Sequence, residues 1–411
     1  MDPHCAVSGP ADLDRACSEP SAALGVIGSD PISLWTRFRG TPFMSGSVIL
    51  AGGGSGGHLS PGLAVAERLQ TLFAETQLLF ACSDRPIDRK MLEHAGASFH
   101  SISAAPFSVK PSGFLRFIRG LHQGTRQSKQ LIEANQGRVV LALGGFVSAP
   151  VVRAARQAGL RTLLLNLDAV PGRANQWVAR RAQEVYTALP LQEGVHLPNL
   201  VGEVGFPVRR AAVAPADSAT CRERLGLSPH QPTLLVTGAS QGATSINRFI
   251  EGSLSSLAGS LIDWEVLHLS GRADRARLES AYASAGIKAV VLDFLDHMGL
   301  AWGAAELAIS RAGANSVAEV ALNRVPTLFV PYPWHKDLHQ QFNAQPLVDA
   351  GGAQLALDQI EPEANETSIG RPLRDLLLDP GRRRDMRTVL ETLPARDGAM
   401  EIAKLLHQAM L

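Results

Sequence analysis

A glycine-rich stretch at residues 52–58 is the part of the sequence best suited to chemistry. The four apolar residues 48–51 predict a buried strand before it, and the apolar spacing of 63–69 predicts a helix after it. Glycine tolerates positive φ and lets backbone N–H groups approach an anion at the positive end of a helix. His58 stands where the loop meets this helix, and its imidazole suits a general base or a phosphate partner.

The same stretch also fits the dinucleotide-binding spacing G-x-G-x-x-G through Gly52, Gly54 and Gly57. Asp84, which follows the next apolar run, would then be the acid that binds a ribose. A dehydrogenase has no use for an imidazole directly after the last glycine, whereas a group-transfer enzyme does. The sequence therefore favours group transfer, with a nicotinamide-dependent dehydrogenase as the alternative.

A second glycine loop, at 144–150, follows the apolar run 139–143. Loops after the strands of a parallel sheet emerge at one edge, so the two glycine loops are expected to line one crevice. Facing loops of this kind can hold a diphosphate through backbone N–H groups without a metal. An ordinary Gly-Gly turn is the alternative. Asn166 and Asp168 end the next strand and suit either a site or a turn cap.

The second half of the chain repeats this organisation. The strand 233–237 enters a small-residue loop at 238–243, and the strand 307–309 enters a helix that contains Glu319. Glu319 suits hydrogen bonds from ribose hydroxyls, although an acid early in a helix also matches the helix dipole. The polar segment 332–343 contains His, Gln and Asn side chains that suit a sugar.

Composition limits the class of protein. The chain has 411 residues with 45% hydrophobic and 19% charged content, which suits two domains. With 39 basic and 38 acidic residues, no global field indicates nucleic-acid binding. The four cysteines are widely spaced and indicate neither zinc nor a disulfide framework. No apolar run reaches the roughly 18 residues that a membrane span needs.

Alternating strands and helices predict an α/β protein with two Rossmann-like, doubly wound parallel-sheet domains facing across a cleft. We expect a disordered extension at 1–45, a first domain at 46–209, a linker at 210–231, a second domain at 232–378 and returning helices at 379–411. Segment 107–134 combines an apolar helical stripe with basic residues. It suits a core-packing helix or a face that binds an anionic membrane.

Five motifs occur in one order: Gly-Gly-Ser-Gly-Gly-His, Gly-Gly-Phe-Val-Ser-Ala-Pro, Gly-Ala-Ser-Gln-Gly-Ala, Ser-Arg-Ala-Gly through Glu319, and His-Lys-Asp-Leu-His-Gln-Gln-Phe-Asn-Ala. Over 47–407 the chain thereby resembles the MurG family, the peptidoglycan UDP-N-acetylglucosamine (UDP-GlcNAc) transferases of the GT-B fold. The resemblance implies transfer of N-acetylglucosamine from UDP-GlcNAc to the C4 hydroxyl of undecaprenyl-pyrophosphoryl-N-acetylmuramyl-pentapeptide, with inversion. It also implies no metal or cofactor, a place at the cytoplasmic face of the inner membrane, and a part in cell-wall synthesis, cell shape and division.

The resemblance also assigns roles to residues. His58 is the expected base, with a pKa lowered by the helix start, and Glu319 is expected to act at the donor ribose. The further positions expected to bind UDP-GlcNAc are Ser55, Gly56, Gly57, Asp168, Arg209, Ser240, Leu295, Arg311, Ala314, Asn315, Ser316, Val317, Ala318 and Gln340. The acceptor diphosphate is expected at Gly53, Gly54, Gly144, Gly145 and Ser148.

Some positions depart from the family pattern. The family's His-Glu-Gln-Asn is Leu-Asn-Leu-Asp at 165–168, its loop Tyr is Phe146, its loop Thr is Ser55, and Phe206 replaces an Asn. The donor half matches better than the acceptor half. Two further hypotheses follow, a GT-B transferase with another lipid or small-molecule acceptor and an inactive paralogue that binds UDP-sugar.

Overall fold

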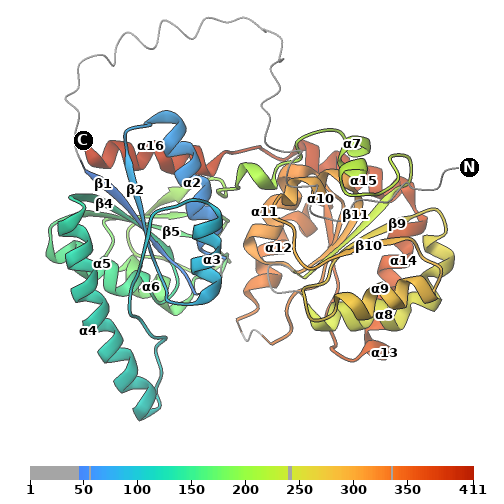
Figure 1. Ribbon diagram of the computed structural model, residues 1–411, viewed down its shortest axis with the longest axis horizontal. Helices are drawn as coiled ribbons and strands as arrows, with labels where there is room; N and C mark the ends of the chain where they lie inside the picture. The colour runs from blue at the N-terminus through green and yellow to red at the C-terminus, as the bar shows by residue number, and fades with distance from the viewer. Residues whose placement is uncertain (1–45, 55–56, 239–242, 335–336) are drawn as a thin grey trace, which may run out of the picture. The chain divides into compact units, whose positions relative to one another are not determined.

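The computed structural model describes residues 46–54, 57–238, 243–334 and 337–411. The expected extension 1–45 and the expected site residues Ser55, Gly56 and Ser240 lie outside the described residues. Two parallel sheets are present, each with helices on both faces (Figure 1). The predicted α/β architecture is therefore confirmed.

The first sheet has seven strands in the order β3-β2-β1-β4-β5-β6-β7, and every neighbouring pair is parallel. Because the order reverses between β1 and β4, the loops that follow these strands diverge and leave room for a ligand. The strands are β1 (Ser47–Gly52), β2 (Gln77–Cys82), β3 (Phe99–Ser101), β4 (Gly137–Gly144), β5 (Arg161–Asn166), β6 (Glu184–Thr187) and β7 (Leu200–Glu203). The helices between them are α2 (Leu59–Leu72), α3 (Pro86–His94), α4 (Pro111–Ala134), α5 (Ser148–Gln157) and α6 (Arg173–Ala179).

The second sheet has six parallel strands in the order β10-β9-β8-β11-β12-β13, with the reversal between β8 and β11. Its strands are β8 (Thr233–Thr237), β9 (Glu265–Leu269), β10 (Ala289–Leu292), β11 (Ala305–Ser310), β12 (Thr327–Phe329) and β13 (Ala353–Leu355). Its helices are α8 (Thr244–Leu257), α9 (Arg275–Ser284), α10 (Met298–Ala304), α11 (Ala314–Asn323), α12 (His339–Asp349), α13 (Pro362–Asn365), α14 (Arg371–Leu378) and α15 (Pro380–Thr392). The segment between the sheets contains a short 3-10 turn (Arg210–Ala212) and α7 (Ser218–Arg224).

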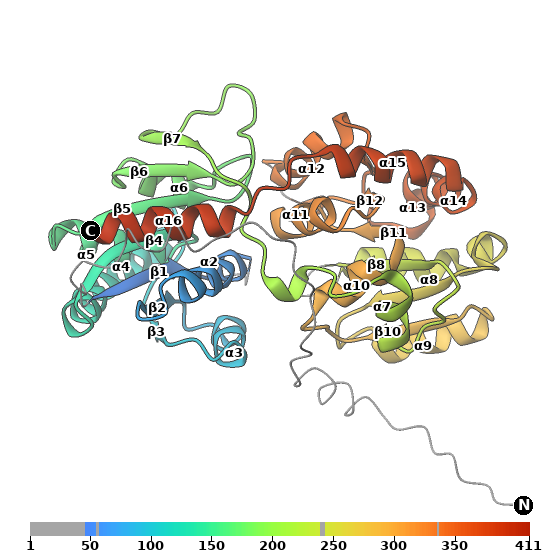
Figure 2. The same ribbon diagram turned by 90° about the horizontal axis from the view of Figure 1, so that it is seen from above.

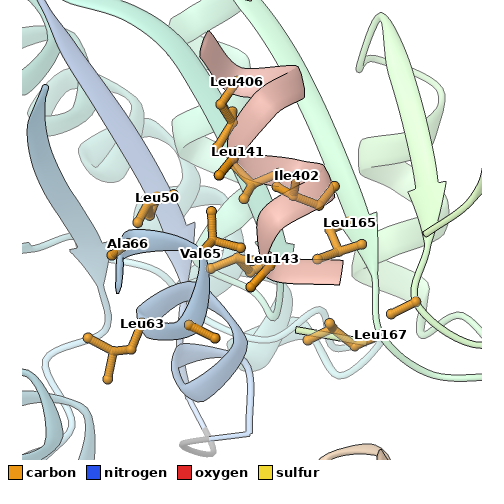
Figure 3. Close-up of a cluster of buried hydrophobic side chains, with 14 of the residues drawn as sticks. Leu50, Leu63, Val65, Ala66, Leu141, Leu143, Leu165, Leu167, Ile402 and Leu406 are labelled. Carbon is orange, nitrogen blue, oxygen red and sulfur yellow. The ribbon is translucent and has the colours of Figure 1, made fainter. Parts of the chain in front are cut away.

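The last helix, α16 (Gly398–Met410), packs on the first sheet although it follows the second in sequence (Figure 2). Its apolar residues Ile402 and Leu406 are fully buried and lie with Leu141 and Leu165 in one core cluster (Figure 3). Asp397 caps this helix by accepting a hydrogen bond from the Met400 backbone N–H at 3.0 Å. Burial of this apolar stripe joins the end of the chain to the first domain.

Helix α4 is buried only in its second half, at Gly124, Thr125, Ser128, Leu131 and Ile132. Its first half extends beyond the sheet (Figure 1) and leaves Phe114 and Leu115 about half exposed, at 47% and 49%. The core-packing interpretation of 107–134 therefore holds for the second half of the helix, and another explanation is needed for the first half. Within the described residues, no helix is long and apolar enough to cross a membrane.

Candidate active site

The first glycine loop begins where β1 ends. Gly53 and Gly54 have φ of 148° and 106°, a region that favours glycine. The Gly54 N–H donates to Asp88 Oδ2 at 2.7 Å, and a Cβ on Gly53 would overlap with the same oxygen. Close approach to a buried carboxylate therefore explains the glycine at 53, whereas at 54 a Cβ would lie 2.8 Å from Phe146 Cε1.

The second glycine loop lies directly against the first. Gly144 and Gly145 have φ of 108° and 77°, and a Cβ on Gly145 would overlap with the Gly53 carbonyl oxygen. Ser148, which is fully buried, accepts a hydrogen bond from the Gly144 N–H at 3.2 Å and donates to the Ala51 carbonyl at 2.9 Å. Its hydroxyl thus joins the loop to β1, whereas the sequence predicted that it would face the acceptor diphosphate.

His58 immediately precedes α2, and its imidazole packs against the second loop. A Cβ on Gly144 would lie 2.9 Å from His58 Cδ2, so only glycine leaves room for the ring. Burial lowers the pKa of His58 below 6.5, and the negative charges of Asp168 and Asp88 oppose that shift. The direction agrees with the sequence prediction, but its main cause is burial rather than the helix start. His58 Nδ1 is buried and has no hydrogen-bond partner among the described residues.

Asp168 lies after β5 and contacts the second domain. Its Oδ1 accepts a hydrogen bond from Asn343 Nδ2 at 3.0 Å, and the Ala169 N–H donates to Asn343 Oδ1 at 2.9 Å. Asn166 acts locally, because its Nδ2 donates to the Asp168 carbonyl at 2.7 Å. Asn343, which the sequence suggested for a sugar, is therefore committed to a polar contact between α12 and the end of β5.

The N-terminus of α11 lies opposite the first glycine loop. Asn315 Nδ2 donates to the Gly57 carbonyl at 2.9 Å. The first backbone N–H groups of an α-helix have no partner inside the helix, so this end favours anions. The side chains of four further residues in the first turns of this helix are buried: Ala314, Ser316, Val317 and Ala318. Any contact that these four residues make with a diphosphate would therefore come from the backbone.

Glu319 lies in the second turn of α11, within the first turns of the helix as the sequence predicted. Its Oε2 accepts a hydrogen bond from Trp302 Nε1 at 2.7 Å. Burial raises the pKa of Glu319 to about 7, while Trp302 and Arg209 act in the opposite direction. Arg209 is also 3.4 Å from Glu67 Oε1, an ion pair between partly exposed groups. Glu319 is thus an acid that can change protonation near neutral pH.

Arg311 differs most from its predicted role beside the leaving UDP. Its guanidinium donates to the carbonyls of Val330 and Pro331 at 3.0 and 3.1 Å. It also pairs with Asp358 at 2.9 Å and donates to Ser245 Oγ at 2.6 Å. The side chain is buried and its hydrogen bonds are internal, so it can influence a ligand only through the segments that it holds together.

Two other expected donor-site residues lie on loops of the second domain. Leu295 is partly exposed between β10 and α10. Gln340, at the start of α12, accepts a hydrogen bond from the Tyr332 N–H through Oε1 at 2.9 Å. Within the described residues, no group of three or more His, Cys, Asp or Glu side chains is placed to hold a metal.

Sequence reasoning missed two residues beside the glycine loops, Arg85 and Asp88. The fully buried Asp88 accepts hydrogen bonds from the Gly54 N–H and from Ser83 Oγ, the latter at 2.5 Å. Arg85 donates from its guanidinium to the Gly54 carbonyl. The only sequence signal was Pro86 followed by an acid, which predicts a helix start but not what that start touches.

Comparison with known proteins places both domains in one glycosyltransferase family. Residues 48–187 match the glycosyltransferase family 28 N-terminal domain, and residues 233–402 match the family 28 C-terminal domain. Similar chains from Geobacter sp. (strain M21) and Acidothermus cellulolyticus are each named UDP-N-acetylglucosamine--N-acetylmuramyl-(pentapeptide) pyrophosphoryl-undecaprenol N-acetylglucosamine transferase. They are 31% and 33% identical, and the matches cover 86% and 88% of this chain and 94% and 97% of the relatives.

Among solved structures, MurG of Acinetobacter baumannii has a TM-score of 0.66 at 24% identity, with 88% of this chain and 99% of that chain covered. A UDP-glucosyltransferase from Polygonum tinctorium has a TM-score of 0.64 at 14% identity, with 89% and 98% covered. These two likenesses show the GT-B fold, and the identity to the named relatives adds the family. From the ordered motifs, the two family 28 domains and these relatives, the chain belongs to the MurG family of glycosyltransferases.

Proposed function

We propose that this chain transfers N-acetylglucosamine from UDP-GlcNAc to the C4 hydroxyl of undecaprenyl-pyrophosphoryl-N-acetylmuramyl-pentapeptide, with inversion at the anomeric carbon. The relatives' name describes a GlcNAc transfer to this lipid-linked acceptor. The observation that carries the proposal is His58, a half-buried imidazole held against the second glycine loop, with the N-terminus of α11 opposite its own loop. This arrangement supports the use of His58 as the acceptor base beside a helix end that favours anions.

On the acceptor side, His58 takes the proton of the C4 hydroxyl while that oxygen attacks the anomeric carbon and the bond to the UDP oxygen breaks. A lowered pKa keeps the imidazole neutral and ready to accept this proton at neutral pH. The nearby charges of Asp168 and Asp88 then stabilise the imidazolium that forms. Backbone N–H groups at Gly53 and Gly145 hold the acceptor diphosphate. Gly54 and Gly144 shape the two loops instead, because their N–H groups donate to Asp88 and Ser148.

On the donor side, the backbone at 314–318 binds the diphosphate of UDP-GlcNAc and Glu319 binds the ribose. Asp168, Arg209, Leu295 and Gln340 complete the donor site. Arg311 acts indirectly, by fixing Ser245 at the start of α8 and the segment after β12. We retain Ser55, Gly56 and Ser240 as predicted donor contacts.

We also propose that residues 46–209 bind the acceptor and the membrane, and that residues 232–378 bind the donor. The exposed Phe107, Val109, Phe114 and Leu115 surround the start of α4, and Lys110, Arg116 and Arg119 lie on the same segment. Apolar side chains next to basic ones suit the surface of an anionic bilayer. This face would place the enzyme peripherally at the cytoplasmic side of the inner membrane, where it meets a lipid-linked acceptor.

The direct test is incubation of the purified chain with labelled UDP-GlcNAc and a lipid-linked muramyl-pentapeptide acceptor, scored for the disaccharide product. His58→Ala serves as the chemical control and should yield little product. Absence of product with the wild-type chain would reject the proposal. Product with a different lipid acceptor would then indicate another transferase, and binding of UDP-GlcNAc without any transfer would indicate an inactive paralogue.

A further inference from the structure

The turn between β2 and α3 contacts both glycine loops. Ser83 Oγ donates to Asp88 Oδ2 at 2.5 Å, and the Arg85 N–H donates to Ser83 Oγ at 3.3 Å. The same Asp88 oxygen accepts the Gly54 N–H at 2.7 Å. This turn is therefore fixed to the first glycine loop by a buried carboxylate, and it places the Arg85 side chain at that loop.

The Arg85 side chain reaches both glycine loops. Its Nη1 donates to the Gly54 carbonyl in the first loop. Its guanidinium carbon lies 5.4 Å from the ring centroid of Phe146 in the second loop, a cation–π distance. Arg85 is exposed, and within the described part of the chain no carboxylate forms an ion pair with it. Most of its five N–H donors are therefore available to a ligand.

Two carboxylates lie near the glycine loops, so an anion bound there needs a positive charge to balance them. The two carboxylates whose charges act on His58, Asp88 and Asp168, would both repel an anion that lies on the glycine loops. A diphosphate linked at both ends carries two negative charges, whereas backbone N–H groups supply only partial positive charge. A guanidinium supplies a full charge and can bind two phosphate oxygens at once.

We propose that Arg85 contacts the substrate by binding the diphosphate of the lipid-linked acceptor across the two glycine loops. This inference rests on the proposed function, because it assumes that an acceptor diphosphate lies there. It adds a charged side chain to a site otherwise composed of backbone N–H groups. It also gives Asp88 a positioning role, since that carboxylate holds the turn from which Arg85 extends.

The test compares the wild-type chain with Arg85→Ala and Arg85→Lys, using an acceptor with a diphosphate linkage and one with a neutral linkage in its place. Loss of charge-assisted hydrogen bonds should raise the acceptor KM of Arg85→Ala on the order of 10- to 100-fold and leave the donor KM unchanged. Arg85→Lys should recover part of the loss, since it keeps the charge but not the bidentate geometry. Arg89→Ala, which changes an exposed arginine on the helix that follows this turn, α3, is the matched control and should behave as wild type.

The two acceptors separate binding from a structural role. If Arg85 binds the diphosphate, its removal should not affect the acceptor with the neutral linkage, and direct binding of the diphosphate acceptor without donor should weaken similarly. An equal loss with both acceptors, or a raised donor KM, would overturn the inference in favour of loop support. An unchanged acceptor KM would also overturn it. Transfer by the wild-type chain in the same assay keeps these results separate from failure of the proposed function.

Discussion

Replacing Trp302 with Phe should make donor binding depend on pH in a defined way. Trp302 is 1% exposed, and its indole N–H donates to Glu319 Oε2 at 2.7 Å. This bond favours the ionised carboxylate, because the N–H interacts more strongly with a charged acceptor. Trp302→Phe keeps an aromatic ring but removes the donor, so the pKa of Glu319 should rise further above its value of about 7.

The size of the effect follows from the hydrogen bond. A bond to a charged group contributes about 1.5–3 kcal/mol, and 1.36 kcal/mol corresponds to one pKa unit. Glu319 is partly exposed, so water can replace part of the hydrogen bond that Trp302→Phe removes. We therefore expect the pKa of Glu319 to rise by about one unit, to about 8. The ionised fraction at pH 7 then falls from about one half to about one eleventh, which weakens donor binding about fivefold.

Calorimetric titration with UDP-GlcNAc between pH 6 and 8.5 measures this effect, since neither esterified phosphate of the ligand titrates in that range. The wild-type affinity should increase about 10-fold as pH rises through 7, because ionised Glu319 is the form that accepts hydrogen bonds from ribose hydroxyls. In Trp302→Phe the midpoint should move up, with near-normal affinity at pH 8.5. The matched control is Trp264→Phe, which changes another buried indole of the same domain. The ring centroid of Trp264 lies 4.8 Å from the guanidinium carbon of Arg383, whereas the hydrogen bond to Glu319 comes from Trp302. A flat affinity profile in the wild type, or an unshifted midpoint in Trp302→Phe, would refute the reasoning.

Three further predictions concern the first domain. His58→Ala should lower kcat about 100-fold or more at unchanged donor KM. With donor at saturation, the wild-type kcat should fall only below pH 6.5, because the pKa of His58 is lowered. A kcat profile that falls at higher pH would argue against His58 as the base. Ile402→Ala should lower the free energy of unfolding of the first domain by about 2–5 kcal/mol, because it leaves a cavity in the core. Urea unfolding measures this loss, with Leu405→Ala, a change at a partly exposed residue of the same helix, as the control. Equal stabilities of the two variants would contradict the packing of α16. The double variant Phe114→Ser, Leu115→Ser should reduce sedimentation with anionic vesicles while leaving transfer to a short-chain soluble acceptor intact, and unchanged sedimentation would exclude this face from membrane binding.

Local patterns in the sequence determined much of the fold. Apolar runs of four and five residues before the glycine loops predicted β1 and β4, because a strand buried on both faces needs continuous apolar residues. Gly53 and Gly144 were recognisable as special for a local reason, since positive φ is a property of the single residue. The order of five short motifs was enough to predict the family and the repeated α/β architecture.

Only the tertiary structure decided which side chains meet at those loops. Asp88 and Gly54 are 34 residues apart in sequence, and Asn343 and Asp168 are 175 apart, so no local period relates them. Their contacts depend on the strand order and on how the connecting helices pack. The same reason explains Arg311 and Glu319, for which residue type and spacing suggested a ligand. Arg311 is buried and its guanidinium donates to groups of its own domain. Burial also raises the pKa of Glu319. Sequence thus determined the local elements and the loop chemistry, whereas long-range packing determined charge, protonation and orientation at the site.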